Sequence, residues 1–139
     1  MSMTLDFSEL KVLIVEDNEH AMRLVKMVLR DLGVTQIYSA KDGMEALEFL
    51  SKCGKLVDLM ISDWNMPRMT GIDLYKTVQE KWQELPFLML TARNTFESVQ
   101  EARSEGLKYY IAKPFAPDVL ERKIISMVRT LQPAEGQPA

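Results

Sequence analysis

Short runs of apolar residues alternate along this chain with segments in which apolar residues recur every three or four positions. The runs are short and nearly all apolar, as expected for β-strands covered on both faces. The periodic segments predict amphipathic helices, bounded by the glycines and prolines that commonly end such elements. The expected strands are KVLIV from Lys11, QIYSA from Gln36, VDLMIS from Val57, PFLMLT from Pro86 and YYIA from Tyr109.

Helical segments follow each of these strands. They are predicted from Met22 to Leu32, from Asp42 to near Gly54, from Ile72 to Val78, from about Thr95 to Gly106 and from Pro117 to Leu131. Gly33 is a suitable C-cap for the first helix, and Pro117 suits the first turn of the last one. Because parallel strands need crossover connections, the alternation predicts an α/β protein with one doubly wound parallel sheet of five strands and five helices.

The length of 139 residues fits one domain with a single core. We expect this domain to span residues 10–131, with an N-terminal extension at 1–9 and a flexible C-terminal tail at 132–139. The net charge of -3 and the absence of a basic cluster argue against nucleic-acid binding. No apolar stretch approaches the roughly 18 residues that span a bilayer, so we do not expect membrane insertion. No export signal is visible, so we expect the protein to be located in the cytoplasm.

Polar residues follow four of the five predicted strands. Glu16 and Asp17 follow the first strand, Asp63 the third, Thr91 the fourth and Lys113 the fifth. If these strands are neighbours, their carboxyl ends share the edge at which open α/β sheets bind ligands. Each residue alone has an ordinary structural explanation, such as a helix cap, a turn or a surface lysine. Their joint placement is what indicates a functional site.

Carboxylates crowded at one edge need a positive partner, because two unit charges about 4 Å apart repel by about 4 kcal/mol at an effective dielectric constant of roughly 20. Mg²⁺ suits such oxygen ligands, and Mn²⁺ could substitute for it. Asp17 and Asp63 are the expected direct ligands, and Glu16 would reach either the ion or one of its waters. Asp63 could then attack phosphorus as a nucleophile, while Lys113 and Thr91 each serve one oxygen of the transferred group.

Four sequence blocks lie in order at the predicted strand ends: VLIVEDNE, ISDWNMPRMTG, the LTA that ends at Ala92, and YYIAKPF. Together they resemble the signatures of response-regulator receiver domains. The resemblance covers about residues 11–131, and ISDWNMP is similar to chemotaxis regulators of the CheY type. It implies a flavodoxin-like fold with the strand order 2-1-3-4-5. It also implies a two-component signalling protein that catalyses only its own phosphorylation and dephosphorylation and is not a turnover enzyme.

The resemblance assigns roles around the metal and the phosphoryl group. Asp63 would accept the phosphoryl group from a histidine kinase, and the backbone carbonyl of Asn65 would be a further metal ligand. Asn65 and Arg93 occupy positions that tune how fast the acyl phosphate hydrolyses in receivers. Glu16 departs from the family pattern, in which an aspartate is often found at this position.

The resemblance also implies a switch. Thr91 would move toward the phosphoryl group, Tyr110 would follow it inward, and the peptide bond between Lys113 and Pro114 would be cis. The fourth helix, fifth strand and fifth helix would then bind a downstream protein target. A monomer is expected, with dimerisation on phosphorylation left open.

Three alternatives remain at this stage. The chain could be a receiver module cut from a larger regulator, with QPAEGQPA as the start of a linker. A Mg²⁺-dependent phosphohydrolase would also use a nucleophilic aspartate, but its Asp-x-Asp pattern after the first strand is missing. A flavodoxin-like flavin carrier needs a phosphate loop rich in Gly, Ser and Thr, whereas EDNEH is acidic here.

Overall fold

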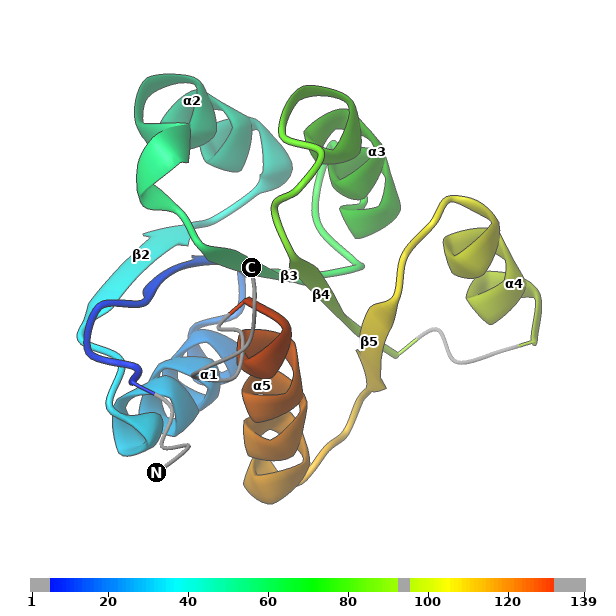
Figure 1. The fold of residues 1–139 in the computed structure, drawn as a ribbon. Coiled ribbons are helices and arrows are strands. Elements are labelled where there is room, and N and C mark those ends of the chain that lie inside the picture. Colours follow the sequence, from blue (N-terminus) through cyan, green and yellow to red (C-terminus); the bar gives the residue numbers. More distant parts are fainter. Residues whose placement is uncertain (1–5, 93–95, 132–139) are drawn as a thin grey trace.

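A computed structural model describes residues 6–92 and 96–131 of the chain. They form one parallel sheet with helices on both faces (Figure 1). The strands are β1 (Lys11–Val15), β2 (Gln36–Ala40), β3 (Leu59–Asp63), β4 (Phe87–Thr91) and β5 (Tyr109–Ala112). The helices are α1 (Glu19–Leu32), α2 (Gly43–Cys53), α3 (Gly71–Lys81), α4 (Phe96–Ser104) and α5 (Pro117–Leu131), with a short 3₁₀ helix η1 (Gly54–Leu56) after α2.

The strand order is β2-β1-β3-β4-β5, and all four pairings are parallel. This confirms the predicted fold class and order. The register aligns Val15 with Ser62, and Thr91 with Ala112, so that the carboxyl ends of β1, β3, β4 and β5 lie level with one another. This alignment brings the residues that follow these strands to one edge of the sheet.

The core consists of two apolar layers, one on each face of the sheet. Val12 and Ile14 of β1 belong to the layer under α1 and α5, whereas Leu13 and Val15 belong to the layer under α2, α3 and α4. This alternation follows from the two-residue period of a strand. Because both faces are covered, the strands are apolar throughout, which is the pattern that predicted them.

Polar side chains fix the starts of three helices. Asn18, Asp42 and Thr70 each accept a hydrogen bond from a backbone N–H in the first turn of α1, α2 and α3 respectively. Gly33 ends α1 with a φ of 103°, a left-handed conformation that glycine adopts without strain. Local hydrogen bonds and one glycine therefore set these helix ends.

The structure differs from the sequence prediction at some element limits. β3 begins at Leu59 rather than Val57, because the N–H of Val57 donates to the carbonyl of Gly54 and closes η1, which the pattern did not predict. The fourth helix is shorter than expected, at Phe96–Ser104. Phe7, placed in the N-terminal extension by the sequence, is buried in the core. The predicted tail at 132–139 lies outside the described residues.

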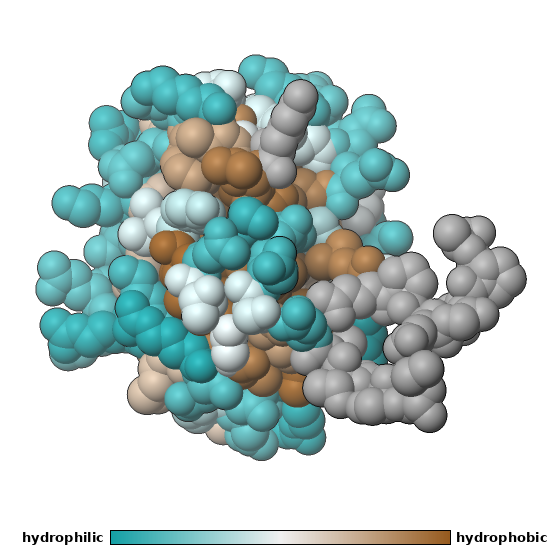
Figure 2. Space-filling model, turned by 60° about the vertical axis from the view of Figure 1, so that its left-hand side comes forward, coloured by the Kyte–Doolittle hydropathy of each residue, from teal (hydrophilic) through white to brown (hydrophobic). Residues whose placement is uncertain are grey.

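The molecular surface carries apolar residues in separate groups. Figure 2 shows one face, on which these groups lie between hydrophilic residues. Met27, Met44 and Leu56 are large apolar residues that are exposed, and they come from different elements. None of the helices formed by residues 6–92 and 96–131 has the length and apolar character needed to cross a membrane.

Leu88→Ala tests the two-layer core. Leu88 is fully buried in β4, so its truncation should leave a cavity and lower the free energy of unfolding by about 2–5 kcal/mol. Urea denaturation measures this loss. Met44→Ala, at an exposed position of α2, is the control and should change the free energy by no more than about 0.5 kcal/mol. Equal effects at the two positions would contradict the packing described above.

Candidate functional site

Three carboxylates converge at the carboxyl edge of the sheet. One ligand oxygen from each of Glu16, Asp17 and Asp63 lies within 4.8 Å of the other two. Glu16 and Asp17 follow β1, and Asp63 is the last residue of β3, the neighbouring strand. The parallel pairing of β1 with β3 therefore produces the predicted cluster.

Lys113 joins this cluster from the far strand of the sheet. Its Nζ lies 3.1 Å from Oδ1 of Asp63 and 3.3 Å from Oε1 of Glu16. The backbone N–H of Lys113 donates to the carbonyl oxygen of Thr91 at 2.7 Å, which extends the β4–β5 pairing by one residue. The peptide bond between Lys113 and Pro114 is cis. Residues separated by nearly 100 positions thus form one group of charges.

Burial makes the ionised form of Glu16 unfavourable. Its side chain is only 2% exposed, and this burial raises its pKa above the usual value, an effect increased by the negative charge of Asp63. The Lys113 ammonium and the backbone N–H of Asn18 act in the opposite direction but do not compensate fully. For Lys113, burial alone would lower the pKa, yet the charges of Asp63 and Glu16 outweigh burial and raise it.

The donor set fits a hard divalent cation. Three carboxylates and one ammonium leave an excess of negative charge, and oxygen ligands of this type are those that Mg²⁺ and Mn²⁺ accept. Glu16, Asp17 and Asp63 could hold such an ion. Asn65, the expected backbone ligand, is exposed in the loop that follows β3.

The predicted switch residues lie on neighbouring strands. Thr91 is buried at the end of β4, in register with Ala112. Tyr110 is half-buried in the layer under α2, α3 and α4. Because Ala112 and Tyr110 are two residues apart on β5, the strand period places Thr91 and Tyr110 on the same face of the sheet. Arg93, expected to tune the lifetime, lies outside the described residues.

The loop between β3 and α3 contains two features that the sequence did not reveal. Gly71 begins α3, and its N–H donates to the carbonyl of Trp64 at 2.7 Å. Arg68 has a positive φ of 68° and forms an ion pair with Asp42. A glycine at the loop's end was visible in the sequence, but nothing in a linear pattern relates Arg68 to a residue 26 positions away.

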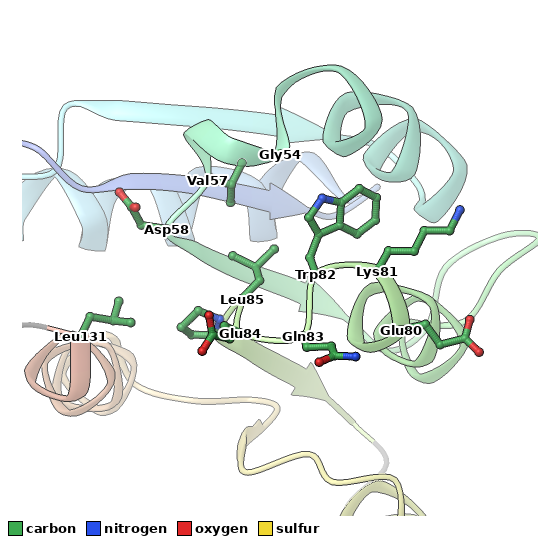
Figure 3. A pocket seen from close by; sticks show the side chains of 11 residues that line it. Gly54, Val57, Asp58, Glu80, Lys81, Trp82, Gln83, Glu84, Leu85 and Leu131 are labelled. Atoms are coloured by element: carbon green, nitrogen blue, oxygen red, sulfur yellow. The ribbon is translucent and has the colours of Figure 1, made fainter.

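A separate cavity of about 670 Å³ lies at the amino ends of β3 and β4, where Asp58 and Pro86 precede these strands. Figure 3 shows Trp82 beside Gly54 on one side of this cavity. Leu131, at the end of α5, is also in its lining. None of the converging carboxylates contributes to this cavity, so the candidate site is confined to the opposite edge.

Comparison with known families agrees with the fold. The family model for the response regulator receiver domain matches residues 12–125, nearly the whole sheet and its helices. The chain belongs to the response regulator receiver family. The resemblance read from the four sequence blocks is therefore confirmed.

Relatives of this receiver are chemotaxis proteins. It is 43% identical over 117 residues to the chemotaxis protein CheY of Pseudomonas aeruginosa, a match that covers 83% of this chain and 93% of that protein. Chemotaxis protein CheY-3 of Vibrio cholerae is 43% identical over 117 residues, covering 83% of this chain and 88% of the relative. The structure of CheY4 of Vibrio cholerae superposes with a TM-score of 0.76 at 36% identity, covering 87% of this chain and 99% of that one. The receiver is thus of the CheY type.

Gly71→Ala tests the close approach of the loop to β3. A methyl group at Gly71 would overlap the carbonyl oxygen of Asp63 and lie 2.7 Å from Cα of Trp64. Because both are backbone atoms, the loop or the strand end must move, and we expect the free energy of unfolding to fall by about 1–3 kcal/mol in urea. Gly43→Ala is the control, since a methyl group there meets only the flexible Met69 side chain. A comparable loss at Gly43 would contradict this account.

Glu16→Gln tests the cost of the buried charge. The raised pKa of Glu16 means that the folded receiver binds this proton more tightly than the unfolded chain does. The contribution of Glu16 to the free energy of unfolding therefore falls as the pH rises from about 4.5 through the raised pKa. We expect the glutamine variant to be more stable than the native receiver at neutral pH in EDTA, with a smaller difference in acid.

Urea denaturation at several pH values measures this difference. The control is Glu48→Gln on the exposed face of α2, where a surface ion pair contributes little and the change should stay within about 0.5 kcal/mol. A Glu16→Gln variant that is less stable than the native receiver at neutral pH would show that ionised Glu16 stabilises the fold.

Proposed function

We propose that this receiver accepts a phosphoryl group from a histidine kinase onto Asp63, in a Mg²⁺-dependent reaction, and thereby switches a protein-binding surface. The observation that carries the proposal is the meeting of Glu16, Asp17 and Asp63 with Lys113 at one edge of the sheet. The receiver domain would comprise residues 10–131. The reaction changes the state of the receiver itself and turns over no separate substrate.

The metal would be held by oxygen atoms from two strand ends and the adjoining loop. Asp17 and Asp63 are the proposed direct carboxylate ligands, the carbonyl of Asn65 is a further ligand, and Glu16 reaches the ion or one of its waters. When bound, Mg²⁺ supplies positive charge next to the transferred phosphoryl oxygens. The excess of carboxylates over ammonium groups supports this assignment.

Asp63 would be the nucleophile. One carboxylate oxygen forms a bond to phosphorus while the phosphorus–nitrogen bond of the donor phosphohistidine breaks, and the departing imidazole takes up a proton. Asp63 is mostly buried, which limits the access of competing water. Lys113, already 3.1 Å from Oδ1 of Asp63, would neutralise charge on a transferred oxygen.

Thr91 would translate phosphorylation into a change of surface. A phosphoryl group can shift a conformational equilibrium only through contacts present in one state and absent in the other. The hydroxyl of Thr91 would provide such a contact, and Tyr110, on the same face of the sheet, would follow it inward. α4, β5 and α5 would then present the altered surface to a downstream protein.

The pathway proposed is chemotaxis-type signalling, because the relatives at 43% identity are named as chemotaxis proteins. Signalling would occur through protein contact. The receiver is proposed to be a monomer before phosphorylation. Asn65 and Arg93 are proposed to set the lifetime of the phosphorylated state.

Asp63→Asn tests the phosphoacceptor. Incubation of the native receiver with acetyl phosphate and Mg²⁺ should add the mass of one phosphoryl group to the intact protein, and EDTA should prevent it. The asparagine variant should show no adduct, because its amide is not a competent nucleophile. Asp73→Asn, at an exposed position of α3, is the matched control and should be phosphorylated like the native receiver. An adduct that persists in Asp63→Asn would refute the assignment.

A further inference from the structure

The tip of the loop between β3 and α3 has an unusual backbone conformation. Arg68 has a φ of 68°, and the N–H of Met69 donates to the carbonyl oxygen of Pro67 at 2.7 Å. This is a γ-turn centred on a residue with positive φ, which is rare and strained for side chains other than glycine. The strain must be offset by contacts that the tip makes elsewhere.

Those contacts lead to the start of α2. Nη2 of Arg68 lies 3.0 Å from Oδ2 of Asp42, while Oδ1 of Asp42 accepts a hydrogen bond from the N–H of Glu45 at 2.8 Å. Asp42 therefore caps α2 and binds the loop with its two oxygens. The Met69 side chain also lies close to Gly43, the first residue of α2. A methyl group added at Gly43 would come within 2.7 Å of Sδ of Met69.

The base of the same loop is fixed to the sheet. The N–H of Trp64 donates to the carbonyl of Leu90 on β4 at 2.9 Å, and the carbonyl of Trp64 accepts from the N–H of Gly71 at 2.7 Å. Asn65 lies between this base and the tip at Arg68. The backbone path through Asn65 is therefore held at both ends.

We propose that Arg68 is a positioning residue whose ion pair with Asp42 holds the carbonyl of Asn65 ready for a divalent cation and couples cation binding to the start of α2. This inference rests on the proposed function, because it takes Asn65 as a backbone ligand of Mg²⁺. The coupling is reciprocal: if the ion pair favours the bound cation, the bound cation favours the ion pair equally.

A contribution to stability alone does not account for this arrangement. The Arg68 side chain is 74% exposed, and ion pairs with an exposed partner contribute little to folding. Glycine would adopt the same φ without strain. Arginine at this position therefore lowers the freedom of the loop while adding strain, which suits a role in positioning.

Electrostatics gives the test a distinctive sign. Arg68 carries a positive charge in a loop that would bind a cation, so its removal should tighten cation binding if charge repulsion were the main effect. The positioning role predicts the opposite result. A weaker affinity after removal of a positive charge can arise only if Arg68 organises the site.

The experiment uses the full chain in a Trp82→Phe background, with the emission of Trp64, next to Asp63, as the reporter of Mg²⁺ binding. Arg68→Gly should weaken the apparent Mg²⁺ affinity by about two- to fivefold, the range set by a partly exposed ion pair. The urea midpoint measured without metal should be unchanged or higher, because the strain is relieved. Arg68→Lys, which keeps a positive charge, should recover part of the affinity.

Arg23→Ala is the matched control. Arg23 is an exposed arginine in a cavity lined by Glu16 and Asp17, so its removal should leave Mg²⁺ affinity unchanged or tighten it. Asp42→Asn keeps a cap for α2 but loses the charge, and combined with Arg68→Gly it should cause no further loss of affinity.

Amide hydrogen exchange gives a readout that does not depend on fluorescence. Mg²⁺ should slow exchange at the N–H of Glu45 in the native receiver and not in Arg68→Gly. Equal or tighter Mg²⁺ binding in Arg68→Gly would overturn this inference alone. If Mg²⁺ changes neither the emission of Trp64 nor the exchange at the N–H of Glu45 in the receiver with native Arg68, the proposed function is overturned together with the inference.

Discussion

Parallel pairing of β1, β3, β4 and β5 is the constraint on which the site depends. In a parallel sheet the carboxyl ends of all strands lie at one edge. Residues that are far apart in the sequence therefore meet at this edge. Glu16 and Lys113 are brought within 3.3 Å in this way. An antiparallel arrangement of the same strands would send half of these side chains to the opposite end of the molecule.

The charges gathered at this edge oppose the stability of the fold. Glu16 and Asp63 are both buried, and Lys113 is the ammonium that contacts each of them. Burial of charges is unfavourable unless they are paired, and here the pairing is incomplete. The unfavourable interactions would be relieved by a cation and then altered by a phosphoryl group. The proposed cation and phosphoryl group would therefore act on a group of charges that is not fully compensated by Lys113 alone.

Much of this arrangement could be predicted from the sequence. Periodicity predicted the five strands and five helices, and the residue types at strand ends predicted the cluster of Glu16, Asp17 and Asp63. The strand order came from a family resemblance, because a period describes each element separately and says nothing of which strands are neighbours. The roles of Thr91 and Tyr110 remain predictions.

Features set by tertiary contact were not predictable. The later start of β3 is a separate case with a local cause, the hydrogen bond from the N–H of Val57 to the carbonyl of Gly54. The need for glycine at 71 comes from the backbone of Asp63 and Trp64, and the pair between Arg68 and Asp42 joins two loops across the edge. Such contacts depend on the packed geometry of α2, α3 and the sheet, which no linear pattern contains.

The two ends of the described chain lie on the side of the sheet remote from Asp63. The N–H of Lys11, at the start of β1, donates to Oδ2 of Asp58, and Leu131 shares the cavity lined by Asp58 and Pro86. A fluorescent protein or an affinity handle joined directly at residue 6 or residue 131 would therefore lie at the amino edge of the sheet. Such a fusion would leave uncovered the opposite edge, where Glu16, Asp63 and Lys113 meet.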